Sequence, residues 1–205
     1  EYPDAADQQG DRAQCRKIAE KLVATDMDVK TIYTDLFQRS LYRVGELWET
    51  NQISVATEHL ATAITDGLLS LVYPQMFASD HIGKQAVISC SANEYHQIGG
   101  KMVADIFELN GWHGHFLGAN TPMEDLLAFV DEKKPDVMGL SLSIYSNLPR
   151  LLETVEAVRG NFTDLDLFLG GQAFRWGGQA AVRRVPRTRY IPGLFELEQQ
   201  IIGSR

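Results

Sequence analysis

The stretch QAVISCSANEYHQIGG, residues 85–100, changes from an apolar run to a polar loop that ends in two glycines. Its first six residues are mostly apolar or small, which is typical of a strand buried in a parallel sheet. Three more short apolar runs follow, HGHFLG, DVMGLSLS and DLFLGG, and stretches with helical periodicity separate them. This alternation predicts a parallel sheet with crossover helices. RYIPG is a candidate short last strand, and LFELEQQII a candidate closing helix.

The residues before this stretch have a different pattern. From about residue 11 to residue 77 glycine is rare, and apolar residues recur at helical spacing. Asn51 interrupts the pattern, and Ser54 is placed to cap the helix that follows. We therefore predict an α + α/β fold with two domains. Residues 1–79 form an N-terminal cap of the four-helix-bundle type, and residues 80–205 form a Rossmann-like (flavodoxin-like) parallel-sheet domain.

The composition excludes several classes of protein. The chain is 44% hydrophobic and 22% charged, and it lacks an apolar run close to the roughly eighteen residues that cross a bilayer. The net charge of −8 argues against direct nucleic-acid binding by this segment. Cys15 and Cys90 lie far apart in the sequence, so we expect reduced thiols in a cytoplasmic protein.

The N-terminal residues EYPDAADQQGDR are acidic and polar, which is not the pattern of a secretion signal. The chain begins with Glu1 and not with Met, which makes it a candidate segment of a longer protein. An output domain could then lie outside this sequence.

The loop after the first predicted strand carries the chemistry. Ligands of an open parallel sheet bind beyond the carboxyl ends of its strands, and this loop contains Glu94, His96 and Gly99. The order Glu94-x-His96-x-x-Gly99 resembles the motif of base-off, His-on cobalamin-binding domains, as in methionine synthase, several mutases, corrinoid proteins and light-sensing cobalamin repressors.

The resemblance implies a role for each of these residues. His96 would displace the benzimidazole of the cofactor and bind cobalt as its lower axial ligand. Glu94 is the carboxylate that could accept a hydrogen bond from the second imidazole nitrogen, which fixes the tautomer and raises the basicity of the ligand. Gly99 would let the displaced nucleotide tail pass close to the backbone.

Two later segments match the same family. A Ser-x-Leu segment is expected after the third strand, and Ser141 lies there, although Ser143 stands where the family prefers Leu and Leu142 comes one place early. A Gly-Gly pair is expected after the fourth strand, and Gly170 and Gly171 occupy that place. The resemblance implies that these residues line the slot for the nucleotide tail, while glycines that merely end a strand are the alternative.

The helical half carries a second resemblance. Trp48, nine residues, then Glu58 and His59 is similar to the Trp-x9-Glu-His pattern of the adenosylcobalamin-dependent photoreceptor module. That resemblance implies that Trp48 packs against a 5′-deoxyadenosyl group and Glu58 hydrogen-bonds it. Light would cleave the cobalt–carbon bond, and His59 would be the candidate upper axial ligand opposite His96. Cap packing, oligomeric state and output would then change.

Several alternatives stay open. The resemblance favours a sensor over an enzyme, with a homo-oligomer and an effector domain or partner protein to carry the signal. A bilin such as biliverdin is a candidate second chromophore. A corrinoid carrier of methyl groups between methyltransferase partners has the same two-domain architecture, and a flavodoxin-like domain without cobalamin is a third interpretation.

Other residues allow weaker interpretations. His113 and His115 alternate along a predicted strand and so face the same side, but a metal site there would need further ligands. Trp176 is a candidate for shaping the nucleotide slot or for a subunit contact.

Overall fold

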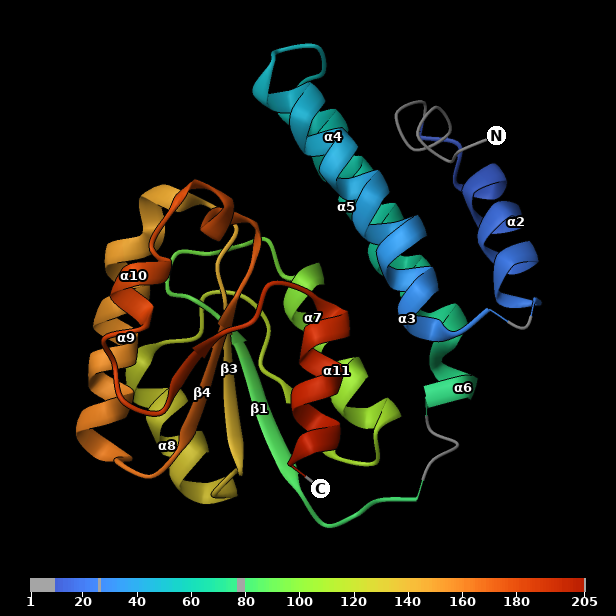
Figure 1. Ribbon diagram of the computed structural model, residues 1–205. Helices are drawn as coiled ribbons and strands as arrows, with labels where there is room; N and C mark the ends of the chain where they lie inside the picture. Colours follow the sequence, from blue (N-terminus) through green and yellow to red (C-terminus); the bar gives the residue numbers. More distant parts are fainter. Residues whose placement is uncertain (1–9, 26, 77–79, 205) are drawn as a thin grey trace. The chain divides into compact units, whose positions relative to one another are not determined.

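The computed structural model describes residues 10–25, 27–76 and 80–204 (Figure 1). Two compact units divide the chain, Glu1–Ala78 and Ser79–Arg205. The N-terminal residues 1–9, considered above for a secretion signal, and residues 77–79 at the junction lie outside the described residues.

The elements described in the first unit are all helices. Among the residues that the structure describes, the first helix is α2 (Arg12–Val23). A second helical stretch joins α3 (Val29–Thr31), the π-helix η1 (Ile32–Gln38) and α4 (Arg39–Glu49). A third joins α5 (Val55–Leu69), η2 (Ser70–Val72) and α6 (Tyr73–Met76).

Local sequence explains where these helices begin. The Asp11 carboxylate accepts a hydrogen bond from the backbone N–H of Gln14 and caps α2. Ser54 caps α5 by accepting from the N–H of Thr57, as predicted. Between α4 and α5, Asn51 adopts a positive φ of 56°, a conformation that asparagine tolerates better than most residues.

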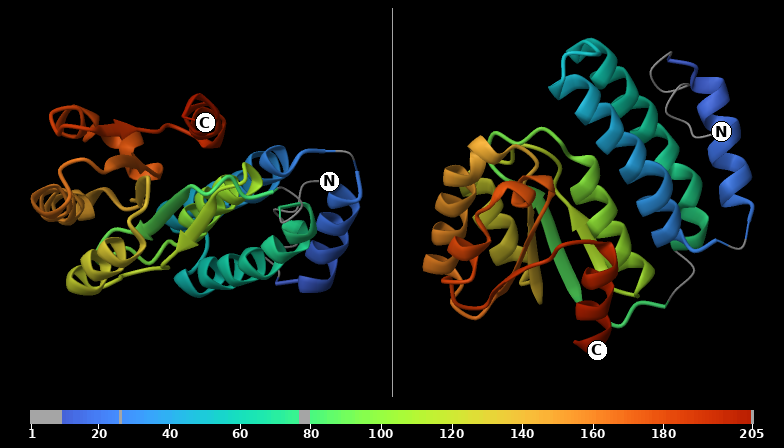
Figure 2. Two further views of the ribbon diagram at one scale, coloured as in Figure 1. Left: turned by 90° about the horizontal axis from the view of Figure 1, so that it is seen from below. Right: turned by 45° about the horizontal axis from the view of Figure 1, so that its top comes forward.

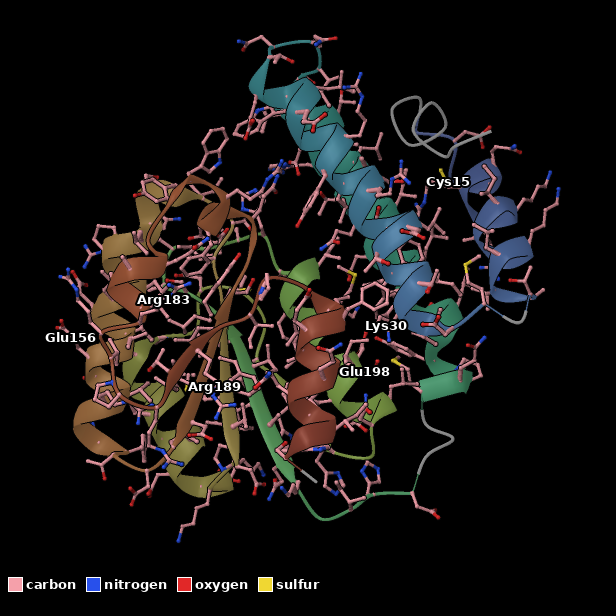
Figure 3. The ribbon with its side chains drawn as sticks, in the orientation of Figure 1. Cys15, Lys30, Glu156, Arg183, Arg189 and Glu198 are labelled. Carbon is pink, nitrogen blue, oxygen red and sulfur yellow. The ribbon has the colours of Figure 1, made fainter. Side chains whose placement is uncertain are left out.

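Apolar side chains of these helices form the core of the unit. α4 and α5 pack along one another, and α2 adds small residues, among them Cys15, which Figure 3 labels. The buried apolar residues of α2, α4 and α5 are Cys15, Ala19, Val44, Leu47, Ala61, Ile64 and Leu69.

The second unit is built on a parallel sheet. Its strands are β1 (Gln85–Cys90), β2 (His113–Phe116), β3 (Val137–Ser141), β4 (Asp166–Gly170) and β5 (Thr188–Tyr190). Within the described residues their order is β2-β1-β3-β4-β5, and all neighbours are parallel. β1 and β3 are the most buried strands, which explains why their sequences are almost continuously apolar.

Helices cover both faces of this sheet (Figures 1 and 2). α7 (Ile98–Leu109) and α11 (Leu194–Gly203) lie on one face. α8 (Met123–Lys133), α9 (Leu148–Asn161) and the short α10 (Gln179–Val182) lie on the other. The core under these three includes Leu126, Val130, Met138, Leu151, Val155, Leu167, Phe174 and Val182.

The predicted fold class is confirmed: a helical N-terminal region precedes a Rossmann-like domain with a parallel sheet. The short last strand and the closing helix are present as β5 and α11. None of the helices in the described residues has the length and apolar character that a membrane span requires.

Candidate functional site

The loops after β1 and β3 leave the carboxyl ends of their strands in opposite directions. β1 lies between β2 and β3, so the chain leaves β1 toward one side and leaves β3 toward β4 on the other. This reversal of direction is a topological switch point, where open α/β sheets bind ligands. Ser91 directly follows β1, and its N–H donates to the carbonyl of Ser141 at the end of β3. The loop with Glu94 and His96 therefore begins at the switch point.

The Glu94 side chain is held in place by several hydrogen bonds. It is fully buried, and its Oε1 accepts from the backbone N–H of His96 at 3.0 Å. Its Oε2 accepts from the N–H groups of Ser143 and Ile144, at 2.8 Å and 2.9 Å. Burial alone would raise the pKa of this carboxyl, but hydrogen bonds from the His96 side chain and these backbone groups outweigh it, and the pKa is lowered. The side chain is therefore an anion that fastens the β1 loop to the β3 loop.

His96 faces this carboxylate with one ring nitrogen. Its Nδ1 lies 2.5 Å from Glu94 Oε1, and its side chain is 45% exposed. Because an ionised carboxylate only accepts, Nδ1 carries the proton of this hydrogen bond. In the neutral imidazole Nε2 then holds the lone pair, which makes Nε2 the nitrogen able to coordinate a metal.

The residues predicted to line a nucleotide slot lie on neighbouring segments. Ser141 and Gly170 are register partners on β3 and β4. A Cβ added at Gly99, at the start of α7, would lie 3.9 Å from Ser141 Oγ. Gly171 has a φ of 115°, and a Cβ there would lie 2.1 Å from the carbonyl oxygen of Leu142. Only glycine fits at that position.

Two further polar groups lie beside the loop. Ser91 is fully buried, and its Oγ has no hydrogen-bond partner among the described residues, which is costly unless a ligand or water satisfies it. Cys90 is also buried, and burial, with a smaller effect of the Glu94 charge, raises the pKa of its thiol to about 12. That thiol is inert at neutral pH.

Together these residues fit a base-off cobalamin. They offer an oriented imidazole, backbone without a side chain at Gly99 and Gly171, and an unsatisfied hydroxyl at Ser91. His96 and Glu94 would hold the metal side of the group, and the β3 and β4 loops its tail.

The helical unit places its three predicted residues around one turn. Trp48 is near the end of α4 and is 38% exposed, while Glu58 and His59 are in the first turns of α5. The α4–α5 turn is closed by backbone bonds to the carbonyls of Leu47 and Trp48. His59 Nδ1 lies 2.7 Å from Glu58 Oε2, and Thr62 Oγ1 donates to Glu58 Oε1 at 2.8 Å.

The sequence did not reveal every residue that shapes the site. Ser143, predicted to line the slot, also donates its backbone N–H to Glu94, which the sequence did not reveal. Asn147 Nδ2 donates to the Asn93 carbonyl and forms a second link between the two loops. Of these features, the sequence could have suggested only the positive φ of 62° at Asn93, because asparagine tolerates that conformation better than most residues.

His113 and His115 face the same side, as predicted, at the far end of the sheet from His96. The His81 ring stacks on His113 with 3.9 Å between centroids. Among the described residues, no group of three or more His, Cys, Asp or Glu side chains is arranged to hold a metal ion.

Two family models match the chain. Both are described as a B12 binding domain; one matches residues 6–73 and the other residues 84–185. Together they cover most of the sequence and both structural units.

Two curated relatives are transcriptional repressors of Myxococcus xanthus. The HTH-type transcriptional repressor CarA is 34% identical over 118 residues, which are 57% of this chain and 38% of CarA. The HTH-type transcriptional repressor CarH is 27% identical over 173 residues, which are 83% of this chain and 56% of CarH. The chain thus spans about half or less of the length of these relatives.

A solved structure shares the fold. The monomethylamine corrinoid protein of Methanosarcina barkeri aligns with a TM-score of 0.84 and 12% identity, over 98% of this chain and 96% of that one. At this identity the likeness concerns the fold alone.

Proposed function

Since the chain belongs to the cobalamin-binding proteins, with a B12 binding domain matched in each of its units, we propose that it is an adenosylcobalamin-dependent light sensor. The observation that carries the cobalamin part is the buried Glu94 carboxylate, which orients the imidazole of His96. The sensor part is supported by the Trp48, Glu58 and His59 pattern and by the similarity to CarA and CarH.

In this proposal Glu94 and His96 act before any light is absorbed. Glu94 accepts a hydrogen bond from His96 Nδ1–H, which leaves the Nε2 lone pair of His96 as the group that would hold cobalt. The N–H groups of Ser143 and Ile144 stabilise the negative charge of the buried carboxylate, so Glu94 stays ionised and His96 keeps this tautomer. Ser141, Ser143, Gly170 and Gly171, with Gly99, would line the path of the nucleotide tail.

The helical unit would protect and report on the upper face. When bound, adenosylcobalamin supplies a cobalt–carbon bond that light can cleave. Trp48 offers a broad, partly exposed ring to pack against the adenosyl group, and Glu58 a carboxylate to hydrogen-bond it. The Glu58 contact at Nδ1 leaves Nε2 of His59 available, so His59 would be a residue able to hold cobalt once the adenosyl group has left.

The signal would be a change in helix packing. If an adenosyl group packs against Trp48, its loss would leave volume beside that ring, and a packed helical bundle would respond by rearranging. We expect the oligomeric state to differ between dark and light, and an effector domain or partner protein to read that difference.

An absorption experiment tests this function. The purified protein is mixed with adenosylcobalamin in the dark and exposed to green light, as wild type, His96→Ala and His59→Ala. We expect a stable light-driven spectral change in the wild type. His96→Ala should lose the His-on spectrum in the dark, and His59→Ala should change only the illuminated spectrum. Wild-type protein that binds no cobalamin would refute the proposal.

One alternative makes a different prediction in the same experiment. The fold is shared with a corrinoid protein, so a methyl carrier would bind methylcobalamin in preference and show no stable photoproduct.

A bilin as second chromophore is tested by adding biliverdin: a new red absorption band supports it. Because Cys15 and Cys90 are both buried, we expect such a band to be lost on denaturation and solvent extraction.

A further inference from the structure

Three large aromatic side chains are exposed on the loops around His96. Tyr95 is 68% exposed, Tyr145 is 44% exposed and Trp176 is 71% exposed. They lie on the loops that follow β1, β3 and β4, which are neighbouring strands of the sheet. Because the carboxyl ends of parallel strands lie at the same end of the sheet, all three residues lie at the end that carries His96.

Contacts between these loops hold the three residues in one region. Ile144, next to Tyr145, donates its N–H to Glu94, next to Tyr95. Asn147, two residues after Tyr145, donates to the carbonyl of Asn93. The β1 and β3 loops are therefore tied together just before Tyr95 and on both sides of Tyr145.

The third aromatic residue is joined to this pair through glycine. Gly177 follows Trp176 and has a φ of 135°. A Cβ at Gly177 would lie 3.2 Å from the Tyr145 hydroxyl, so the phenol packs directly on the Gly177 backbone. Glycine at this position lets Tyr145 and Trp176 occupy adjacent loops without a clash.

We propose that Tyr95, Tyr145 and Trp176 form an aromatic rim that packs against the edge of the corrin ring. This rests on the proposed cobalamin function and assigns a role to three residues outside the His-on motif. A macrocycle whose metal is bound by His96 must extend sideways over the flanking loops, and the rim occupies those loops.

The chemistry of the rim suits a corrin edge. That edge alternates methyl groups with amide side chains. Tyrosine and tryptophan combine an apolar ring with one hydrogen-bond donor, so they can cover methyl groups and bond an amide at once. Exposed aromatic surface of this kind, clustered beside a binding loop, is typical of a ligand or interface surface.

Equilibrium dialysis with two corrinoids tests the rim. Cobalamin and cobinamide, which lacks the nucleotide tail, are each titrated against wild type, Trp176→Ala and Trp176→Phe. Trp176→Ala should weaken both corrinoids by a similar factor, about tenfold, because the edge of the ring is common to both. Trp176→Phe should keep most of the affinity. Ile202→Ala is the matched control, since Ile202 is 53% exposed near the C-terminal end of α11.

The possible outcomes separate this proposal from the function on which it rests. Wild-type protein that binds neither corrinoid would overturn the cobalamin function itself. Wild-type binding with an unchanged affinity of Trp176→Ala would overturn only the rim. A loss confined to cobalamin would assign Trp176 to the nucleotide tail, and unchanged binding with an altered oligomeric state in gel filtration would assign it to a subunit contact. Either assignment, to the nucleotide tail or to a subunit contact, would contradict the proposal.

Discussion

Two glutamate–histidine pairs in the described residues, Glu58 with His59 and Glu94 with His96, lie close together in the sequence and differ in the structure. In both, histidine Nδ1 meets a carboxylate oxygen, at 2.5 Å for His96 and Glu94 and at 2.7 Å for His59 and Glu58. Glu94 is fully buried and accepts three backbone N–H groups as well. Glu58 accepts one further bond, from Thr62, and the His59 side chain is 74% exposed.

The difference shows which pair is organised before a ligand arrives. Turning the His96 ring away would leave a buried anion with one donor fewer, which is costly. Turning the His59 ring away costs little, because water can replace the lost contact. In the proposed sensor, a fixed His96 would suit the permanent ligand and an adaptable His59 the replaceable one.

The largest effect should come from removing the fixed imidazole. We expect His96→Ala to lower cobalamin affinity about a hundredfold or more, since loss of a supporting residue alone costs about 10- to 100-fold. His59→Ala should leave dark-state affinity within about threefold. Equilibrium dialysis in the dark measures both, and similar losses for the two variants would contradict the assignment of lower and upper roles.

Glu94→Gln should affect both binding and stability. The amide still accepts at one oxygen, but it brings an NH2 group toward the N–H groups that Glu94 binds. We expect a loss of about 2 kcal/mol or more in the free energy of unfolding and about 10- to 100-fold in cobalamin affinity. Urea denaturation of the cofactor-free protein measures the first and dialysis the second.

The equivalent change in the other pair should be much milder. For Glu58→Gln we expect a loss of less than about 1 kcal/mol in the free energy of unfolding, because its partner is mostly exposed. The same denaturation series provides the measurement. A loss equal to that of Glu94→Gln would show that the two carboxylates are equally constrained.

The smallest expected effect is the contribution of His115 to the pH dependence of stability. It must be known before pH experiments on either glutamate–histidine pair can be interpreted. Burial, followed by the charges of Lys133 and His113, lowers the pKa of His115, against a smaller opposing effect of Glu108. The unfolded state therefore binds a proton more readily, and stability should fall as pH drops below about 6.5 and level off below the folded pKa. His115→Asn should flatten this part of the stability curve between pH 7 and 5. Unchanged pH dependence would mean that other groups dominate it.

The order of helices and strands could be predicted because hydrophobic periodicity and capping residues act locally. Ser54 capped the helix expected of it, and the apolar runs became buried parallel strands. The Glu94-x-His96 spacing also suffices to predict their contact, since two residues of one loop are never far apart.

The tertiary structure decided what the sequence left open. The bonds from Ser143 and Ile144 to Glu94 join residues about fifty positions apart, and the Tyr145 contact with Gly177 joins two separate loops. Such contacts depend on strand order and on how far each loop reaches, which periodicity does not encode. The sequence by itself determined two domains and a histidine motif. Only the packing of the sheet decided which carboxylate is buried, and so which histidine is held in place.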